Sequence, residues 1–281
     1  MRLLRNIIPS LLLIAFLFSC DSADRPDSTK PRARGQIGEI MLAIDSAKWA
    51  GPVGDQLREI FLQDIPGMIR SETMFNVHRV DPRAMNRMLK MSTNIIYVTT
   101  FDDKSGASQA VNAQFTKESK ERAASDPGLY SLRIEDEYAI GQDVLYLFGN
   151  NEEELIANLE KNKAKIQNLF EVRARGRLEK AILSRKNSAA AVAARDNLGI
   201  AIEVPASYQI AKSEEDFLWL RQPTPSANRP DISLFFYSAP YVSEEQTFPE
   251  NILKLRDSIA GKPILGDPEV PPPFLVTQNQ I

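Results

Sequence analysis

Short, nearly continuous apolar runs predict the main strands of the first half of the chain. They lie at residues 40–44, 95–98 and 144–148. Runs of this kind, without polar alternation, are typical of strands buried on both faces, as in a sheet covered by helices. A more mixed pattern around Phe75, Val77 and Val80 predicts a further strand, which we expect near an edge of the sheet.

Helical spacing of apolar residues fills the intervals between these runs. Residues 52–63 form one amphipathic stripe with Pro52 in the first turn, where proline is well tolerated. Asp81 is expected to cap a short helix that carries Met85, Met88 and Leu89. The alternation of strands and helices predicts an α/β layer with a helix-covered mixed sheet over residues 36–150.

The second half has a different pattern. Residues 151–198 predict a helical connector, either one long helix or two consecutive ones, that begins with Glu152, Glu153 and Glu154. Strands are expected at 200–204, 217–220 and 232–237, followed by a helix over 248–260 whose Ile252, Leu255 and Ile259 face inward. Residues 199–281 therefore predict an α+β half with a smaller antiparallel sheet plus a helix.

The N-terminal residues 1–19 resemble a lipoprotein signal peptide. Arg2 and Arg5 precede an apolar run over 7–18, which is shorter than the about 20 residues of a membrane-spanning helix. The run ends in Leu17-Phe18-Ser19-Cys20, the pattern of a bacterial lipobox. We expect Cys20 to carry lipid, and two or more acyl chains would hold the protein on a membrane. The alternative is a plain secreted protein in which this cysteine has no such role.

Residues 20–35 are rich in Asp, Ser, Pro, Lys and Arg, which predicts a disordered tether after the lipidated Cys20. We therefore expect a membrane-anchored lipoprotein of the cell envelope. The outer membrane is favoured over the inner membrane, and the sequence does not determine the leaflet.

Composition excludes several function classes. The chain has 281 residues with 34 basic and 37 acidic side chains, and this balance argues against a nucleic-acid partner. Its single cysteine and single histidine exclude a disulfide scaffold, a zinc finger and a two-histidine metal site. No Walker loop or Gly-x-Gly-x-x-Gly motif is present, so we predict no cofactor.

A search for catalytic residues assigns none. His78 lies on a predicted strand, where a hydrogen-bonded or solvent-facing histidine is the favoured reading over a catalytic base. The acidic groups Asp102-Asp103 and Glu135-Asp136-Glu137 are candidates for paired carboxylates or a divalent metal, but nothing fixes their spacing and solvated loops are favoured.

Two short stretches are weak candidates for a binding surface, namely Trp49, Gly51, Gly54 and Asp55 in the first half, and Trp219 with Arg221 in the second. Glycines beside a helix start allow close approach of an anion or another backbone, and Trp49 offers a stacking face. The favoured alternative is structural: Trp49 plugs the sheet edge, Gly54 permits a tight helix–strand contact, and Asp55 satisfies first-turn amides. For Trp219 and Arg221 the alternative is a core aromatic residue beside a surface charge.

Several of these motifs together resemble a known family. The first stretches are Trp49-Ala50-Gly51-Pro52-Val53-Gly54-Asp55, Phe75-Asn76-Val77 and Asn94-Ile95-Ile96. The second half adds Leu198-Gly199-Ile200, Val204-Pro205, Tyr208, Phe217-Leu218-Trp219-Leu220-Arg221, Pro240-Tyr241, and Phe248 through Lys254-Leu255-Arg256-Asp257-Ser258. From residue 39 to about 258 the chain resembles a lipoprotein family of Bacteroidota described as domain of unknown function 4837. The resemblance implies an envelope lipoprotein and assigns no activity. It also implies that relatives extend beyond Ile281, so we expect a C-terminally truncated second half.

The sequence thus predicts a lipid-anchored envelope protein that is a non-enzymatic binding or assembly module. Its expected partners are membrane lipid, through acylated Cys20, and an unidentified envelope protein or glycan. The alternative function is a hydrolase of an envelope polymer that uses Asp or Glu residues without a recognisable motif.

Overall fold

The computed structural model describes residues 30–68, 71–226 and 231–265. These residues form two compact units, one ending at Arg175 and the other beginning at Gly176. The predicted signal peptide, Cys20 and the tail from residue 266 lie outside the described residues.

The first unit contains a five-stranded sheet in the order β2-β1-β3-β5-β4. β1, β2, β3 and β5 pair in parallel, and β4 pairs antiparallel with β5 at one edge. The elements, in chain order, are β1 (Glu39–Ala43), α2 (Ser46–Ala50), α3 (Pro52–Phe61), β2 (Asn76–Val80), the short 3-10 helices η2 (Pro82–Ala84) and η3 (Leu89–Met91), β3 (Asn94–Thr100), α4 (Gly106–Asn112), α5 (Lys117–Ser125), β4 (Ser131–Glu135), β5 (Asp143–Gly149) and α6 (Glu152–Ile182), of which the residues from Gly176 onward belong to the second unit.

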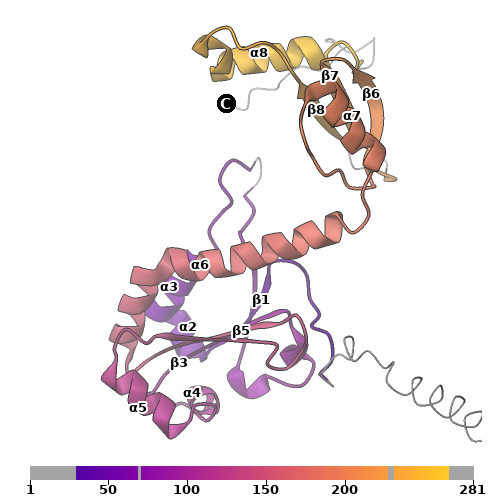
Figure 1. Cartoon of the computed structure of the whole chain (residues 1–281). Coiled ribbons are helices and arrows are strands. Elements are labelled where there is room, and N and C mark those ends of the chain that lie inside the picture. Colours follow the sequence, from indigo (N-terminus) through magenta and orange to yellow (C-terminus); the bar gives the residue numbers. More distant parts are fainter. Residues whose placement is uncertain (1–29, 69–70, 227–230, 266–281) are drawn as a thin grey trace, which may run out of the picture. The chain divides into compact units, whose positions relative to one another are not determined.

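Helices cover both faces of this sheet (Figure 1). One face packs against α3 and α6 in a cluster that includes Ile40, Leu57, Ile96, Leu147 and Phe170. The opposite face packs against α4 and α5 in a second cluster that includes Met41, Val111, Ala123, Val144 and Tyr146. Because both faces are covered, every residue of β3 and of β5 is buried, which explains the continuous apolar runs.

The second unit contains a three-stranded antiparallel sheet, β6 (Gln209–Glu214), β7 (Phe217–Gln222) and β8 (Ile232–Tyr237), with β7 in the centre. α7 (Ser188–Leu198) covers one face through Ala190 and Ala194, which pack against Leu218 and Leu220. η4 (Glu244–Thr247) and α8 (Pro249–Ala260) follow β8.

The predicted fold class is confirmed: a mixed sheet with helices, a long helix, and then an antiparallel sheet with a helix. β1, β3 and β5 fall on the three apolar runs, and β2 is an edge strand as expected. The connector consists of two consecutive helices, the 31-residue α6 and then α7. Around Asp81 the expected helix is only the short η2, capped by the Asp81 side chain, with η3 following it.

Other expectations for the second unit were wrong. Residues 200–204 form no strand, and the first strand is instead β6, whose largely exposed polar residues hid it from a pattern of apolar runs. Pro205 follows this segment, and Ile200, Ile202 and Val204 pack against the α7 cluster instead of entering the sheet. Ile252 and Leu255 of α8 do not face a closed core, since they remain 49% and 43% exposed.

Residues 32–34, near the end of the predicted tether, are hydrogen-bonded to the first unit. Ala33 donates to the carbonyl of Ile140, and Arg34 donates to the carbonyl of Met91. These backbone hydrogen bonds fix residues 32–34 on the first unit although the segment is almost free of apolar side chains.

Substitution of Gly54 tests how closely α3 packs against the backbone of α2 in the first unit. A Cβ atom at Gly54 would lie 1.9 Å from the Trp49 carbonyl oxygen, whereas one at Gly176 in α6 would meet nothing within 4 Å. Gly54→Ala is expected to lower the free energy of unfolding by about 2–4 kcal/mol, because backbone must shift. The matched Gly176→Ala is expected to raise it by about 0.5–1 kcal/mol through helix propensity. Urea unfolding of both variants measures this, and similar changes of the same sign would contradict it.

Candidate functional site

A ligand site in this sheet is expected at the carboxyl ends of the parallel strands. The chain leaves β1 toward β2 on one side and leaves β3 toward β5 on the other, so the direction of connection changes between β1 and β3. In open α/β sheets, ligands bind in the crevice at such a switch point. Here the position is filled by the side chain of Lys48, from α2 directly after β1.

The Lys48 ammonium joins three strand ends. Its Nζ lies 3.1 Å from Oδ2 of Asp103, 2.7 Å from Oε1 of Glu152 and 3.0 Å from Oγ1 of Thr100. Thr100 ends β3, Asp103 follows it, and Glu152 begins α6 after β5. Lys48 is only 5% exposed, so a buried cation is compensated by two carboxylates of neighbouring loops.

The protonation of this cluster follows from its contacts. Burial alone would lower the pKa of Lys48, but Glu152 and Asp103 outweigh burial and raise its pKa above the ordinary value. Burial would likewise raise the pKa of Asp103, but hydrogen bonds from the Ser108 hydroxyl, the Ser105 N–H and Lys48 lower it to about 2. Lys48 is therefore an ammonium ion at neutral pH, which does not form a Schiff base or abstract a proton.

The predicted stretch around Trp49 is engaged within the protein. The Arg58 guanidinium lies 4.6 Å from the Trp49 ring centroid and donates to the Trp49 carbonyl. Gly54 packs directly against that carbonyl, and Asp55 accepts from Arg58 at 2.7 Å. Gly51 is the N-cap residue of α3, with no side-chain cap. Trp49, Gly54 and Asp55 are thus brought together, and Arg58 covers one face of the ring.

Trp219 and Arg221 share a face of β7 but are each paired with β8 or the loop before it. Trp219 Nε1 donates to Ser233 Oγ at 3.1 Å, and its ring stacks on Phe235. The Arg221 guanidinium donates to Asp231. Their polar groups therefore have partners inside the second unit.

The side chains of His78, Glu135 and Asp136 also have local partners. Nε2 of His78 lies 3.1 Å from Glu39, at the exposed edge of the sheet. Glu135 pairs with Arg133 and Arg173, and Asp136 accepts from the N–H groups of Gly141 and Gln142 in a tight turn.

Glu137 belongs to a buried tyrosine cluster under α4 and α5. The Tyr146 hydroxyl oxygen lies 2.9 Å from Oε1 of Glu137 and 2.7 Å from Oε1 of Gln114, either of which can accept its one hydrogen, and Tyr97 stacks on Tyr146 with ring centroids 5.0 Å apart. Burial raises the pKa of Tyr97, Tyr138 and Tyr146 well above the ordinary value. Neutral tyrosines in an apolar core are structural groups, so this cluster supplies no nucleophile.

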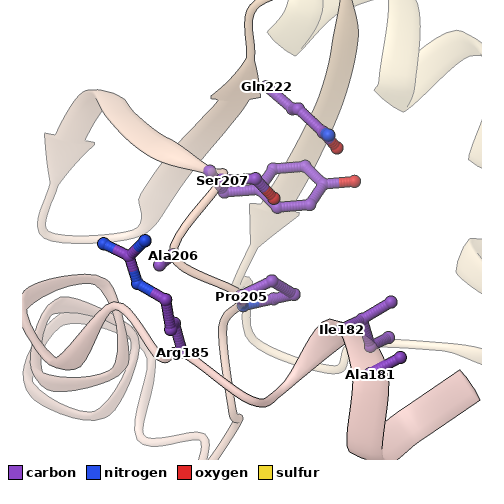
Figure 2. A pocket seen from close by; sticks show the side chains of 8 residues that line it. Ala181, Ile182, Arg185, Pro205, Ala206, Ser207 and Gln222 are labelled. Atoms are coloured by element: carbon purple, nitrogen blue, oxygen red, sulfur yellow. The ribbon is translucent and has the colours of Figure 1, made fainter.

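The second unit holds a cavity of about 550 Å³, here called the Arg185 pocket (Figure 2). This volume lies within the range of about 300–1,000 Å³ of small-molecule sites. Its lining combines polar side chains with an apolar wall: Ala181, Ile182, Arg185, Pro205, Ala206, Ser207, Tyr208 and Gln222. Figure 2 shows Gln222 and Ile182 on opposite sides of Pro205, with Arg185 beside Ala206.

Backbone hydrogen bonds between two segments build this pocket. Ala206 donates to the carbonyl of Arg185 at 2.8 Å, and Asn187 donates to that of Val204 at 2.7 Å. The Asn187 side chain also donates to the Tyr208 carbonyl at 2.8 Å. The loop before β6 is thus fixed against the segment after α6, so the lining is preformed.

The pocket differs from the Lys48 cluster in how its polar groups are used. Across the residues that the structure describes, no hydrogen bond or ion pair engages the side chains of Arg185, Ser207, Tyr208 or Gln222. Sequence reasoning missed both places. Lys48 has no motif around it, and the pocket residues are separated along the chain. The turn expected at Pro205 was the sequence feature that could have pointed to the pocket.

Comparisons with known proteins found two family models, which match different parts of the chain. The model described as Domain of unknown function (DUF8532) matches residues 33–182, and that described as Domain of unknown function (DUF4837) matches residues 187–279. The resemblance to family 4837 is thus confirmed for the second half. It does not extend over the first half as expected, because the Trp49–Asp55 stretch lies in the other match. Comparison with curated proteins found no match, and comparison with solved structures found none either.

Two features are absent from the residues that the structure describes. No helix there has the length and apolar character to cross a membrane. Within the same ranges, no group of three or more His, Cys, Asp or Glu residues is arranged to hold a metal ion.

Loss of the Lys48 ammonium should be costly. Lys48→Met is expected to lower the free energy of unfolding by about 2–4 kcal/mol, because the Asp103 and Glu152 carboxylates are left facing each other. The control Lys117→Met removes an exposed partner of Glu121 and should change it by no more than about 0.5 kcal/mol. Chemical denaturation of both variants measures the difference, and equal midpoints would rule out a supporting role for Lys48.

The Asp103 carboxylate should also make stability depend on acid. Its pKa is about 2 in the folded protein and 3.8 in the reference state. The stabilisation, on the order of 2 kcal/mol, is therefore present above pH 4 and lost as the pH falls toward 2. The difference in unfolding free energy between the unaltered chain and Asp103→Asn should shrink over that window, and a constant difference from pH 6 to pH 2 would contradict the prediction.

Proposed function

The chain belongs to the family described as Domain of unknown function (DUF8532), whose model matches more than half of its length, and we propose that it is a lipid-anchored binding protein of the bacterial cell envelope. The observation that carries this proposal is the position of the sole cysteine. Cys20 follows Leu17-Phe18-Ser19 at the end of an apolar run.

The chemistry of the N-terminus supports the anchor. A small residue at position 19 fits a signal peptidase, and the Cys20 thiol accepts a diacylglyceryl group. Two or more acyl chains give stable membrane attachment, whereas one gives only marginal binding. The resemblance of the second half to a lipoprotein family of Bacteroidota agrees with this placement, and the outer membrane is the favoured location.

The pairing of the candidate carboxylates and the lining of the Arg185 pocket favour binding over hydrolysis. A hydrolase needs carboxylates that are available to substrate, whereas Asp103 is held by Lys48 and Glu135 by Arg133 and Arg173. The Arg185 pocket instead offers a preformed lining whose polar side chains have no partner among the described residues. An envelope glycan or protein is the expected partner.

The anchor is tested by replacing the thiol. Cys20→Ala should abolish acylation and move the protein from the membrane fraction to the soluble fraction of the envelope. Ser19→Ala keeps a small residue and the thiol, so it should leave fractionation unchanged. Mass spectrometry of the mature unaltered protein should find a diacylglyceryl group on an N-terminal Cys20. An unacylated or uncleaved N-terminus would contradict the proposal.

A further inference from the structure

We propose that the Arg185 pocket binds a saccharide unit that carries a carboxylate, such as a uronic acid residue of an envelope polymer. This inference rests on the proposed function, since it names the ligand class of the binding protein. It is carried by the combination of one guanidinium, three neutral polar side chains and an apolar wall in one preformed cavity.

Arg185 supplies the preference for an anion. Among the described residues that line the pocket it is the only charged one, and no ion pair engages it. The neighbouring Lys186, by contrast, is paired with Glu203. A guanidinium has only donors, arranged as a fork that matches the two oxygens of a carboxylate.

The neutral polar groups match hydroxyl-rich ligands. Ser207 and Tyr208 offer hydroxyls that both donate and accept, and the Gln222 amide has a donor and an acceptor side by side. Sugar hydroxyls also donate and accept. A ligand with only acceptors, such as sulfate, would leave part of this capacity unused.

The apolar part of the lining matches the C–H face of a sugar ring. Ile182, Pro205 and Ala206 contribute aliphatic surface, and Tyr208 adds an amphipathic ring that also packs against the α7 cluster. Pro205 is rigid and the loop is hydrogen-bonded at both Val204 and Ala206, so little conformational entropy is lost when a ligand enters.

The experiment compares two disaccharides that differ only in one group. The full chain, in detergent, is titrated by calorimetry or by ligand-observed NMR with a glucuronate-terminated disaccharide and with its glucose-terminated counterpart. The acidic disaccharide is expected to bind about fivefold more tightly, the effect of a partly solvated Arg–carboxylate pair. Equal affinity, or no binding of either sugar at millimolar concentration, would overturn the inference.

Four variants separate the roles of the lining. Arg185→Gln should remove the preference for the acidic sugar, and Arg185→Lys should keep part of it, because the charge remains but the fork is lost. Tyr208→Phe should weaken both sugars alike. Lys180→Gln removes a nearby positive charge that does not line the pocket, so it should change nothing. If Arg185→Gln retains the preference, or Lys180→Gln loses it, the assignment is wrong.

Two controls complete the test. Thermal midpoints of the variants are measured because Arg185 also lies just beyond the carboxyl end of α6, where a cation stabilises a helix; Arg185→Lys keeps that charge and should match the unaltered chain, whereas Arg185→Gln should lower the midpoint slightly. Acetate at the same concentration should not displace the disaccharide, and displacement would mean that the pocket reads charge alone. Membrane fractionation through Cys20 does not depend on Arg185, so failure here is distinguishable from failure of the anchoring proposal.

Discussion

The ion pairs of the Lys48 ammonium with Asp103 and Glu152 hold together the loops at the strand ends of the first unit. Parallel strands end with their loops at one edge, and that edge is where doubly wound sheets leave room for ligands. In this protein a buried cation ties the ends of β1, β3 and β5 together instead. The same carboxylates that would attract a metal or serve as an acid–base pair hold the loops in place.

The second unit uses its polar groups in the opposite way. Its sheet is small, and one face is closed by α7 through alanines that allow close packing. At the loop before β6, backbone hydrogen bonds join the two chain segments, and no side chain in the described part of the protein pairs with those of Arg185, Tyr208 and Gln222. A rigid backbone with uncommitted side chains is the arrangement expected of a preformed recognition site.

How much of this could be read from the sequence depends on where each residue is buried. β1, β3 and β5 were predictable because burial on both faces requires continuous apolar runs, and Pro52 and Glu152 mark helix starts by local rules. β6 was not predictable, since its exposed polar residues leave no periodicity. The absence of a strand at residues 200–204 was not predictable either, because apolar residues that pack under a helix give the same pattern as a strand.

The candidate sites show a similar limit. Trp49 and Gly54 belonged to one candidate stretch, in which the glycine was expected to permit a close helix–strand contact, whereas its close contact is with the backbone carbonyl of Trp49 in α2. Lys48, one residue earlier, carried no signal: its role comes from Asp103 and Glu152, which are distant in sequence and meet it only through the strand order. Pairings set by topology are invisible to local reading, so single-residue motifs in such folds are weak guides to function. Side chains whose polar groups remain uncommitted after folding are stronger ones, and this criterion selects Arg185 over Lys48.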